Sequence, residues 1–469
     1  VRYMGEPIAA VAADHPETCR RALDAIVIHY EVMTPLTSIE DALNPNTPSI
    51  HPDGNVFRHQ RILHGDANAT GDIIVEGEYE IGMQDQAFLG LEAALAYPDS
   101  DGAGVELVVA TQWLHEDQKQ IADCLAMPKE KVRLQLGGVG GAFGAREDIS
   151  LQVHTCLLAL RTGRPVKMQY TREESFFGHV HRHPGVIALK HHVTNEGRIV
   201  KIEGTMKLDG GAYASTSSAV LINGVTHIQG PYKCANAVFD GYAVRTNNPP
   251  CGAMRGFGVV QACFAHEGQM DKLAAATGID EVEIRLRNII HTGDTMITGQ
   301  VLESVAPLER CIRETAAMPL PAEMGLQPHE LDLPGGSGRT ADRRNIVRGI
   351  GWGVSMKNLM YSEGFDDYST ARCTLTNGSV ELKFATSEVG QGFVTLAPQI
   401  ARSVLGVDNV TYDTIDTQIG SAGSTSASRQ TWMSGGAVDG ACRMVRERLF
   451  EHVGATHNVD PLRLAIDDT

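Results

Sequence analysis

Residues 131–148 read Lys-Val-Arg-Leu-Gln-Leu-Gly-Gly-Val-Gly-Gly-Ala-Phe-Gly-Ala-Arg-Glu-Asp, and this stretch decides the predicted fold. Its beginning predicts a β-strand and its remainder a glycine-rich loop. We expect a helix to follow from about Ser150 to Arg161 and to end at Gly163. Glycine lets the backbone approach an anionic group closely, and the N–H groups of a helix N-terminus face such a group. The stretch therefore predicts a site for a phosphorylated or otherwise anionic cofactor.

The same order of strand, glycine- or serine-rich loop and helix is predicted twice more. Strand 380–384 precedes the loop 387–392 and a helix that ends at Leu405. The loop 421–429 precedes a helix from about Ser434 to Phe450, so much of the glycine excess lies in these loops. Standard nucleotide templates do not fit the first loop, because G-x-G-x-x-G puts a phenylalanine at its third glycine and no G-x-x-x-x-G-K-[ST] lies nearby. A dinucleotide fold and a P-loop enzyme are therefore disfavoured.

The composition favours a soluble, acidic protein of about three domains. The 469 residues carry 40 Lys and Arg against 57 Asp and Glu, a net charge of −17. This balance argues against nucleic-acid or anionic-membrane partners, which require clustered positive charge. No apolar stretch approaches the roughly 20 residues that span a bilayer.

The nine cysteines indicate where an iron–sulfur centre would have to be. They are dispersed along the chain and are never spaced C-x-x-C. This spacing excludes an iron–sulfur or zinc-ribbon cassette in this chain and disfavours a disulfide framework. We therefore expect a reducing cytoplasm, with any iron–sulfur centre on a partner subunit.

Two breaks divide the predicted chain. A β-α-β module, with strands at 7–13 and 27–32 around a helix from about 17 to 26, leads into the turn-rich stretch 37–65, which we take as a domain connection. A Pro- and Gly-rich segment at about 318–338 separates a central from a C-terminal block.

Arg255 is the candidate anion-binding side chain. It follows a double proline, stands between glycines in Ala-Met-Arg-Gly-Phe-Gly (253–258), and precedes a helix that runs to Gly278. An arginine presented in this way supplies fixed donors for an oxyanion, and Phe257 could wall an aromatic substrate. The alternative is a surface turn with an ordinary arginine.

Five histidines could suggest a metal site, because alternate residues of a strand face one way. They are His179, His181, His183, His191 and His192. No acidic or thiolate partner lies at ligand spacing beside them, so we expect a polar strand face instead.

Several motifs in register resemble a known family. Four occur in the order found in molybdenum hydroxylases: Gly140-Gly141-Ala142-Phe143-Gly144, the Arg255 segment, Glu388-Val389-Gly390-Gln391-Gly392 and Gly423-Ser424-Thr425-Ser426-Ala427-Ser428-Arg429. Three more resemble the molybdenum-binding large subunit of bacterial xanthine dehydrogenases: 82–90, 110–115 and 362–368. The resemblance covers essentially the whole chain.

The resemblance implies an α+β fold. It implies the remnant of an α/β hammerhead domain with its connection at 1–66, followed by two large mixed α+β molybdopterin-binding domains. These would occupy 67–317 and 340–469, with the linker at 318–339.

The resemblance also implies the site. The residues expected to bind molybdenum-molybdopterin, with or without a cytosine dinucleotide extension, are Gln84, Gln112, Gly141, Phe143, Gly144, Arg255, Gln391, Ala427 and Ser428. Of these, Gln112, Phe143, Arg255 and Ala427 would surround the molybdenum. Gln84 or Gln112 would hydrogen-bond its oxo group.

Four residues are expected at the substrate: Glu147, Phe257, Asn223 and Lys357. Glu147 could accept a purine N–H or, with a raised pKa, donate a proton to a ring nitrogen. Its charge also suits a helix N-terminus.

The implied activity is hydroxylation of xanthine or hypoxanthine with oxygen from water. Electrons would pass to 2Fe–2S and FAD subunits in a dimer of heterotrimers. The alternatives are another N-heterocycle or an aldehyde as substrate, or a non-catalytic cofactor carrier. Carbon monoxide oxidation is disfavoured, because no Cys-Ser-Phe-Arg loop occurs.

The family's catalytic glutamate, in a Gly-Glu motif, has no counterpart after Ala427 and is expected beyond Thr469. We therefore interpret the chain as a fragment or as one part of a naturally split subunit, inactive alone.

Overall fold

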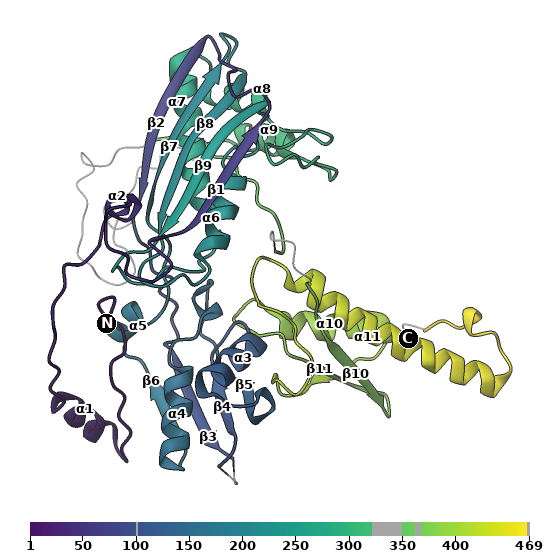
Figure 1. Ribbon diagram of the computed structural model, residues 1–469. Helices are drawn as coiled ribbons and strands as arrows, with labels where there is room; N and C mark the ends of the chain where they lie inside the picture. The colour runs from purple at the N-terminus through teal and green to yellow at the C-terminus, as the bar shows by residue number, and fades with distance from the viewer. Residues whose placement is uncertain (100–101, 321–348, 362–366, 467–469) are drawn as a thin grey trace, which may run out of the picture.

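The computed structural model describes residues 1–99, 102–320, 349–361 and 367–466. A tall five-stranded sheet stands above two smaller sheets that lie side by side (Figure 1). This mixture of sheets and helices confirms the predicted α+β class. The predicted linker 318–339 lies mostly outside the described residues, and the three predicted domain boundaries stay predictions.

The upper sheet has the strand order β1-β9-β8-β7-β2, and only the β8/β9 pair is parallel. Its strands are β1 (Val56–His64), β2 (Ile73–Ile81), β7 (Gly185–Val193), β8 (Ile199–Asp209) and β9 (Asn236–Val244). Helix α6 (Ser217–Thr226) packs on β1 and β9, and α7 (Val259–Thr277) packs on β2 and β7. Alternate strand residues such as Ile187, Ile202 and Phe239 are fully buried between sheet and helices.

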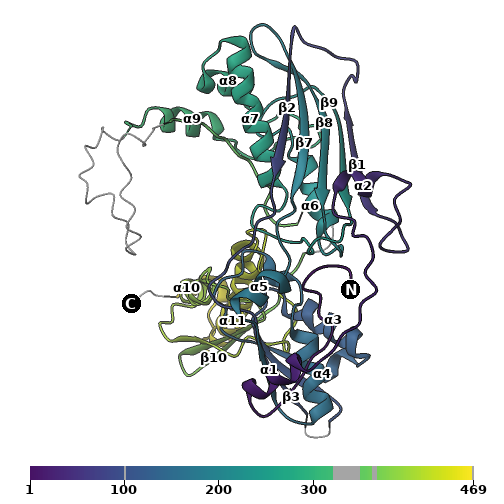
Figure 2. The same ribbon diagram turned by 90° about the vertical axis from the view of Figure 1, so that its left-hand side faces the viewer.

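Helix α7 ends at Gly278, which caps it in the left-handed conformation (φ +69°), as the sequence predicts. The short helix α8 (Glu281–Asn288) packs against α7, and α9 (Leu308–Ala316) packs against α8. Helices α7 and α8 lie on one side of the sheet, and α2 (Ile39–Leu43) lies on the other (Figure 2).

The second sheet has the order β5-β4-β3-β6. Its elements are β3 (Ala93–Pro98), β4 (Val105–Val109), α3 (Leu114–Leu125), β5 (Val132–Leu136), α4 (Gln152–Thr162), β6 (Val166–Gln169) and α5 (Arg172–Gly178). Helix α4 ends at Gly163 with φ +64°, so the strand, loop and helix expected around 131–161 are confirmed.

The third sheet joins the second in one core. It consists of β10 (Ala371–Thr376), β11 (Ser379–Phe384) and β12 (Val410–Tyr412), covered by α10 (Phe393–Leu405) and α11 (Gln430–His457). The Leu136 N–H donates to the Ile415 carbonyl over 2.8 Å, and Leu107, Leu134, Phe384 and Ala397 share one hydrophobic cluster. The first and third glycine-rich loops are thereby held close together.

The N-terminal predictions are partly wrong. Residues 7–13 and 27–32 form no strands, and α1 (Pro16–Asp24) between them buries no residue. The segment runs beside the lower sheets, where Arg164 pairs with Asp14 at 3.4 Å (Figures 1 and 2). A strand requires a hydrogen-bonded neighbour, and no described segment pairs with these residues. Conversely, the predicted connection 37–65 contains β1, which pairs with β9 along its length.

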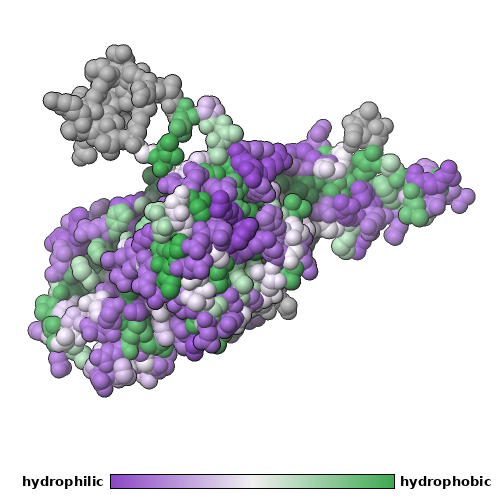
Figure 3. Space-filling model, turned by 90° about the horizontal axis from the view of Figure 1, so that it is seen from above, coloured by the Kyte–Doolittle hydropathy of each residue, from purple (hydrophilic) through white to green (hydrophobic). Residues whose placement is uncertain are grey.

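Hydrophilic residues cover most of the surface seen from above, and hydrophobic residues form separate patches there (Figure 3). Within the described chain, no helix is long and apolar enough to cross a membrane.

Candidate functional site

Gln112 lies between β4 and α3 and joins two of the predicted loops. Its side-chain Oε1 accepts the N–H groups of Gly144 (3.0 Å) and Arg146 (3.2 Å), and its Nε2 donates to the Thr425 carbonyl (2.8 Å). The residue is 3% exposed. The Nε2 group has two hydrogens, and the described residues accept one of them. The other Nε2 hydrogen is left for a ligand. The predicted contact with a cofactor can therefore be made only through that N–H.

The first loop touches the Arg255 loop directly. Gly144 has φ +111°, and a Cβ atom there would lie 2.6 Å from the Ala253 carbonyl oxygen. The Arg255 N–H donates to the Phe143 carbonyl over 2.8 Å. Phe143 itself has φ +55° and is 48% exposed. The fold thus brings the predicted residues Phe143, Gly144 and Arg255 together.

The Arg255 guanidinium makes no hydrogen bond or ion pair to any residue that the structure describes, and the residue is exposed. Its backbone is fixed by contrast: the Arg182 Nη2 donates to the Arg255 carbonyl (2.9 Å). The Asn223 Nδ2 donates to the Phe257 carbonyl (2.8 Å), which holds Phe257 at φ +48°. The result is a free positive charge on a rigid loop, which suits an anionic ligand.

The third loop wraps around Arg429. This side chain is fully buried, donates to the carbonyls of Ala422 (2.7 Å) and Ser424 (2.9 Å), and pairs with Asp367. Ala427 and Ser428 have φ values of +49° and +54°. Such strained residues persist only where the surroundings fix them, and they cluster at ligand sites. The first loop, the Arg255 loop and the third loop each carry one or two such residues. We call the place where these three loops meet the loop junction.

The second loop is different from the expectation. The Glu388 carboxylate accepts the N–H groups of Gly390 (2.8 Å), Gly392 (3.0 Å) and Val394 (3.1 Å). A side chain of the loop itself therefore occupies the anion position at the N-terminus of α10. Gln391 is exposed, and its amide bonds within the loop to Val389 and Ser387. The glycine-rich pattern did not predict that the carboxylate of the preceding Glu388 would cap the loop.

An open hollow of about 480 Å³ lies between the first and second loops. Gly138 and Gly390 line it, and a Cβ atom on either would meet nothing within 4 Å. The Thr425 hydroxyl of the third loop donates to the Ser387 carbonyl at the start of the second loop over 2.7 Å. Glu388 and Asp413 are the charged residues that line the hollow.

Glu147 bridges the first and third loops. Its Oε1 accepts the hydroxyl of Ser424 over 2.9 Å. Burial raises the pKa of Glu147 to about 7, and hydrogen bonds from Ser426 and Ser424 oppose the rise. The Tyr361 hydroxyl accepts the Ser424 N–H (3.2 Å), and its ring stacks on Trp113. At neutral pH Glu147 can therefore donate or accept a proton beside aromatic rings.

The other predicted residues take different positions. Gln84 is exposed, and its Oε1 accepts the Arg182 Nε–H (2.8 Å). Asn223 is 2% exposed and braces the Phe257 backbone, so its role seen here is support. Lys357 lines a second hollow, of about 570 Å³, beside Gly256, and burial lowers its pKa. The motif at 362–368 lies largely outside the described residues.

Sequence reasoning missed Arg182 as a site residue. The side chain is 5% exposed and connects Gln84 to the Arg255 loop. Its position beside three histidines is visible in the sequence, but the residue lies about seventy positions before Arg255, so only the fold reveals the contact.

Molybdopterin is an anionic, phosphate-bearing ligand, and the junction fits such a group. The unpaired Arg255 guanidinium supplies charge, and Gln112 supplies one N–H. The comparisons with known proteins agree. The molybdopterin cofactor-binding domain family matches residues 50–289 and, with its second domain, 334–469.

The chain is similar to several known relatives. It is 41% identical over 307 residues to the nicotinate dehydrogenase large molybdopterin subunit of Eubacterium barkeri, covering 65% of this chain and 72% of that protein. It is 33% identical over 442 residues to a probable xanthine dehydrogenase subunit of Bacillus subtilis, covering 92% of this chain and 57% of that one.

Among solved structures, the aldehyde oxidoreductase of Desulfovibrio gigas superposes with a TM-score of 0.80 at 24% identity, covering 95% of this chain and 50% of that one. This likeness confirms the fold. The matched regions define a molybdopterin-binding protein. The chain belongs to the molybdenum hydroxylase family, and it spans between half and about three-quarters of the length of these relatives.

Proposed function

We propose that this chain binds molybdenum-molybdopterin in an enzyme that hydroxylates a ring carbon of a purine, with water as the source of oxygen. The observation that carries the proposal is Glu147, a carboxyl group with a pKa of about 7 at the junction of the first and third loops. A nitrogen heterocycle needs a group that can exchange a proton with its ring nitrogens, and this pKa suits that exchange.

The residues of this chain would hold the cofactor and orient the substrate. Arg255 would pair with an anionic oxygen, Gln112 would donate its second Nε2 hydrogen, and the backbones of Phe143 and Ala427 would line the metal. Gln84, Gly141, Gly144, Gln391 and Ser428 stay predicted contacts. When bound, the molybdenum cofactor supplies the two-electron oxidation.

Glu147 would bind the ring, and Phe257 would form an aromatic wall. In its protonated form Glu147 donates to an unprotonated ring nitrogen, and in its ionised form it accepts an N–H. Since the pKa is near 7, both forms are populated at neutral pH. The family's general base is not assigned to a residue of this chain.

Nicotinate is the second candidate substrate, and one observation favours it: the relative at 41% identity is a nicotinate dehydrogenase subunit. A carboxylate on the substrate would need a cation. Lys357, in the hollow beside Gly256, would supply one. An aldehyde substrate has neither ring nitrogen nor carboxylate for these groups.

Partner subunits would take the electrons. The relatives are named as subunits, and the cysteines of this chain show no cluster-binding spacing. We propose 2Fe–2S and FAD subunits, a dimer of heterotrimers and a cytoplasmic location.

The test is a substrate panel on the assembly purified with its partners, using an artificial electron acceptor in water enriched in oxygen-18. We expect turnover of xanthine or hypoxanthine with the label in the product. Turnover of nicotinate alone would favour the second candidate. Bound molybdenum without turnover of any heterocycle or aldehyde would support the cofactor-carrier alternative and contradict the proposal.

A further inference from the structure

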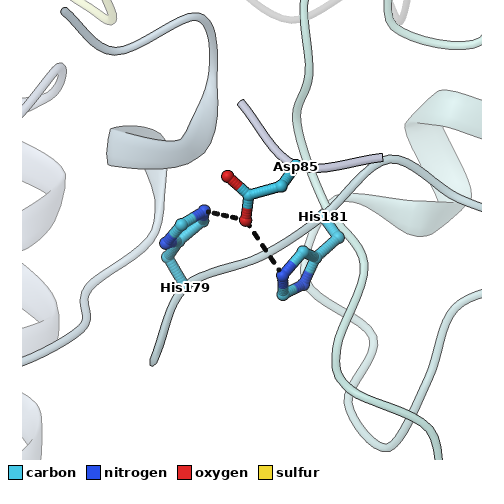
Figure 4. Close-up of side chains that lie close together, drawn as sticks. All are labelled: Asp85, His179 and His181. Carbon is cyan, nitrogen blue, oxygen red and sulfur yellow. Dashed lines mark ion pairs between the residues drawn. The ribbon is translucent and has the colours of Figure 1, made fainter. Parts of the chain in front are cut away.

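A buried cluster of two histidines and one aspartate lies below the five-stranded sheet. Asp85 follows β2, and His179 and His181 follow α5. The Asp85 Oδ2 lies 3.1 Å from the His179 Nε2 and 3.2 Å from the His181 Nε2, and the side chains point toward one another (Figure 4). The side chains are 19%, 2% and 6% exposed, respectively. All three ligand atoms lie within 4.8 Å of one another.

Local sequence offers no acidic partner for these histidines, because Asp85 lies more than ninety residues before them. The expectation of a polar strand face is wrong for them, since all five histidines of the set are buried. The fold brings the missing carboxylate to the two imidazoles.

Ordinary hydrogen bonds do not account for this geometry. The Asp85 Oδ2 and the His179 Nε2 are buried without a hydrogen bond among the described residues, although the two atoms lie 3.1 Å apart. Two ligands at about 2.0–2.1 Å from a tetrahedral zinc ion lie roughly 3.3 Å apart, with the ion off the line that joins them. The Asp85 Oδ2 lies at nearly this distance from the Nε2 atoms of His179 and His181.

Glu92 completes the arrangement. Its Oε1 lies 2.9 Å from the His179 Nδ1, and the residue is 4% exposed. Metal-binding histidines usually donate their second ring N–H to a carboxylate, which fixes the lone pair on the ligating nitrogen. In His179 the nitrogen beside Glu92 is Nδ1, and the ligating nitrogen is Nε2, which faces Asp85. The His181 Nε2 lies 2.9 Å from the Phe176 carbonyl, and its Nδ1 lies 3.4 Å from the Pro250 carbonyl. When Nε2 binds a metal, the ring proton would sit on Nδ1 and face Pro250.

We propose that Asp85, His179 and His181 bind a divalent transition-metal ion of the zinc class, separate from the molybdenum cofactor. Two imidazoles and one carboxylate suit such an ion. The ion would have a positioning role. Gln84 precedes Asp85 and Arg182 follows His181, and Arg182 binds both Gln84 and the Arg255 carbonyl. The ion would fix this connection to the Arg255 loop.

The test is metal analysis of the purified native assembly after dialysis against a chelator and return of Zn²⁺. We expect roughly one zinc ion per chain in the wild type, and loss of that ion in His179→Gln and Asp85→Asn. His192→Gln is the matched control. His192 is also buried, and its Nε2 lies 3.1 Å from the Glu203 Oε1. It does not belong to the cluster of Asp85, His179 and His181. This variant should keep its zinc.

Two further measurements use only the wild type, so they stay valid even if a variant fails to fold. Co²⁺ in place of Zn²⁺ should give visible absorption bands of a four-coordinate nitrogen and oxygen site, and Zn²⁺ should raise the thermal midpoint. The proposal is overturned if the wild type takes up no zinc and shows no cobalt bands. It is equally overturned if His179→Gln binds as much zinc as the wild type, or if His192→Gln loses as much as His179→Gln.

Discussion

Gln112 and Thr425 lie 313 residues apart in the sequence and exchange two hydrogen bonds: the Gln112 Nε2 donates to the Thr425 carbonyl (2.8 Å), and the Thr425 N–H donates to the Gln112 carbonyl (2.9 Å). Because the Gln112 Oε1 also accepts two N–H groups of the first loop, one side chain fixes both loops. Cofactor binding and stability should therefore both depend on Gln112.

Replacing Gln112 with alanine should lower the free energy of unfolding by roughly 2–4 kcal/mol and reduce the molybdenum content several-fold. The variant removes three buried side-chain hydrogen bonds and leaves loop N–H groups without acceptors. Urea unfolding and metal analysis measure the two effects. Gln118→Ala is the control: this buried amide bonds to the Val132 carbonyl (2.7 Å), away from the loops, so it should lower stability and leave molybdenum unchanged. Equal molybdenum losses in both variants would refute a specific role.

Arg255→Ala should change stability by no more than about 0.5 kcal/mol, because the residue is exposed and its guanidinium makes no hydrogen bond or ion pair to a described residue. The molybdenum and pterin content should fall nonetheless, since the ligand loses its charged partner. Arg372→Ala, an exposed arginine on β10, is the control and should retain the cofactor. Full cofactor in Arg255→Ala would assign the residue to an ordinary surface turn.

The pH dependence of stability should reveal Glu147. Folding raises its pKa from 4.5 to about 7, so the folded protein keeps a proton that the unfolded chain has released. The stability from this group is full below pH 4.5 and is lost as pH rises through about 7. Relative to Glu147→Gln, the wild type should lose on the order of 2–3 kcal/mol across this range in urea titrations.

Asp117→Asn separates stability from function. Burial raises the pKa of Asp117 to about 7 as well, and its carboxylate accepts from the Gln152 Nε2 over 3.1 Å. The stability trend should therefore match that of Glu147. Of these two variants, only Glu147→Gln should alter the pH profile of kcat/KM, because Glu147 bonds to Ser424 of the third loop whereas Asp117 bonds to Gln152 on α4. If Asp117→Asn shifted the profile as much, Glu147 would have no special part in the reaction.

Much of the fold follows from local sequence. Gly163, Gly278 and Gly406 end helices where predicted, because each takes a left-handed conformation that other residues rarely adopt. The strands at 7–13 and 27–32 fail because an apolar stretch becomes a strand only beside a partner, which local sequence does not show.

The site residues also divide into those that local sequence predicts and those that only the fold brings together. Phe143, Gly144 and Arg255 are recognisable from their glycine-rich surroundings, and the fold brings them together. The Arg182 bridge and the Asp85 contact join residues about seventy and ninety positions apart, and no local pattern predicts them. Glu388 shows the opposite error: its loop looks open to an anion, but its own carboxylate fills the position.

Glu388→Gln should test whether this carboxylate caps the second loop. Loss of the negative charge at the N-terminus of α10 should lower stability by about 1–2 kcal/mol, and the difference should shrink in high salt. Thermal unfolding at two salt concentrations measures it, with the exposed Glu381→Gln on β11 as control. A salt-independent or absent effect would show that the carboxylate does not cap the loop.

The most direct test of the proposed cofactor site is an anomalous difference map, recorded at the molybdenum absorption edge, from crystals of the loaded assembly. We predict one strong peak at the junction of Phe143, Arg255 and Ala427, beside the Gln112 amide. A molybdenum peak elsewhere in the chain, with this junction empty, would contradict it.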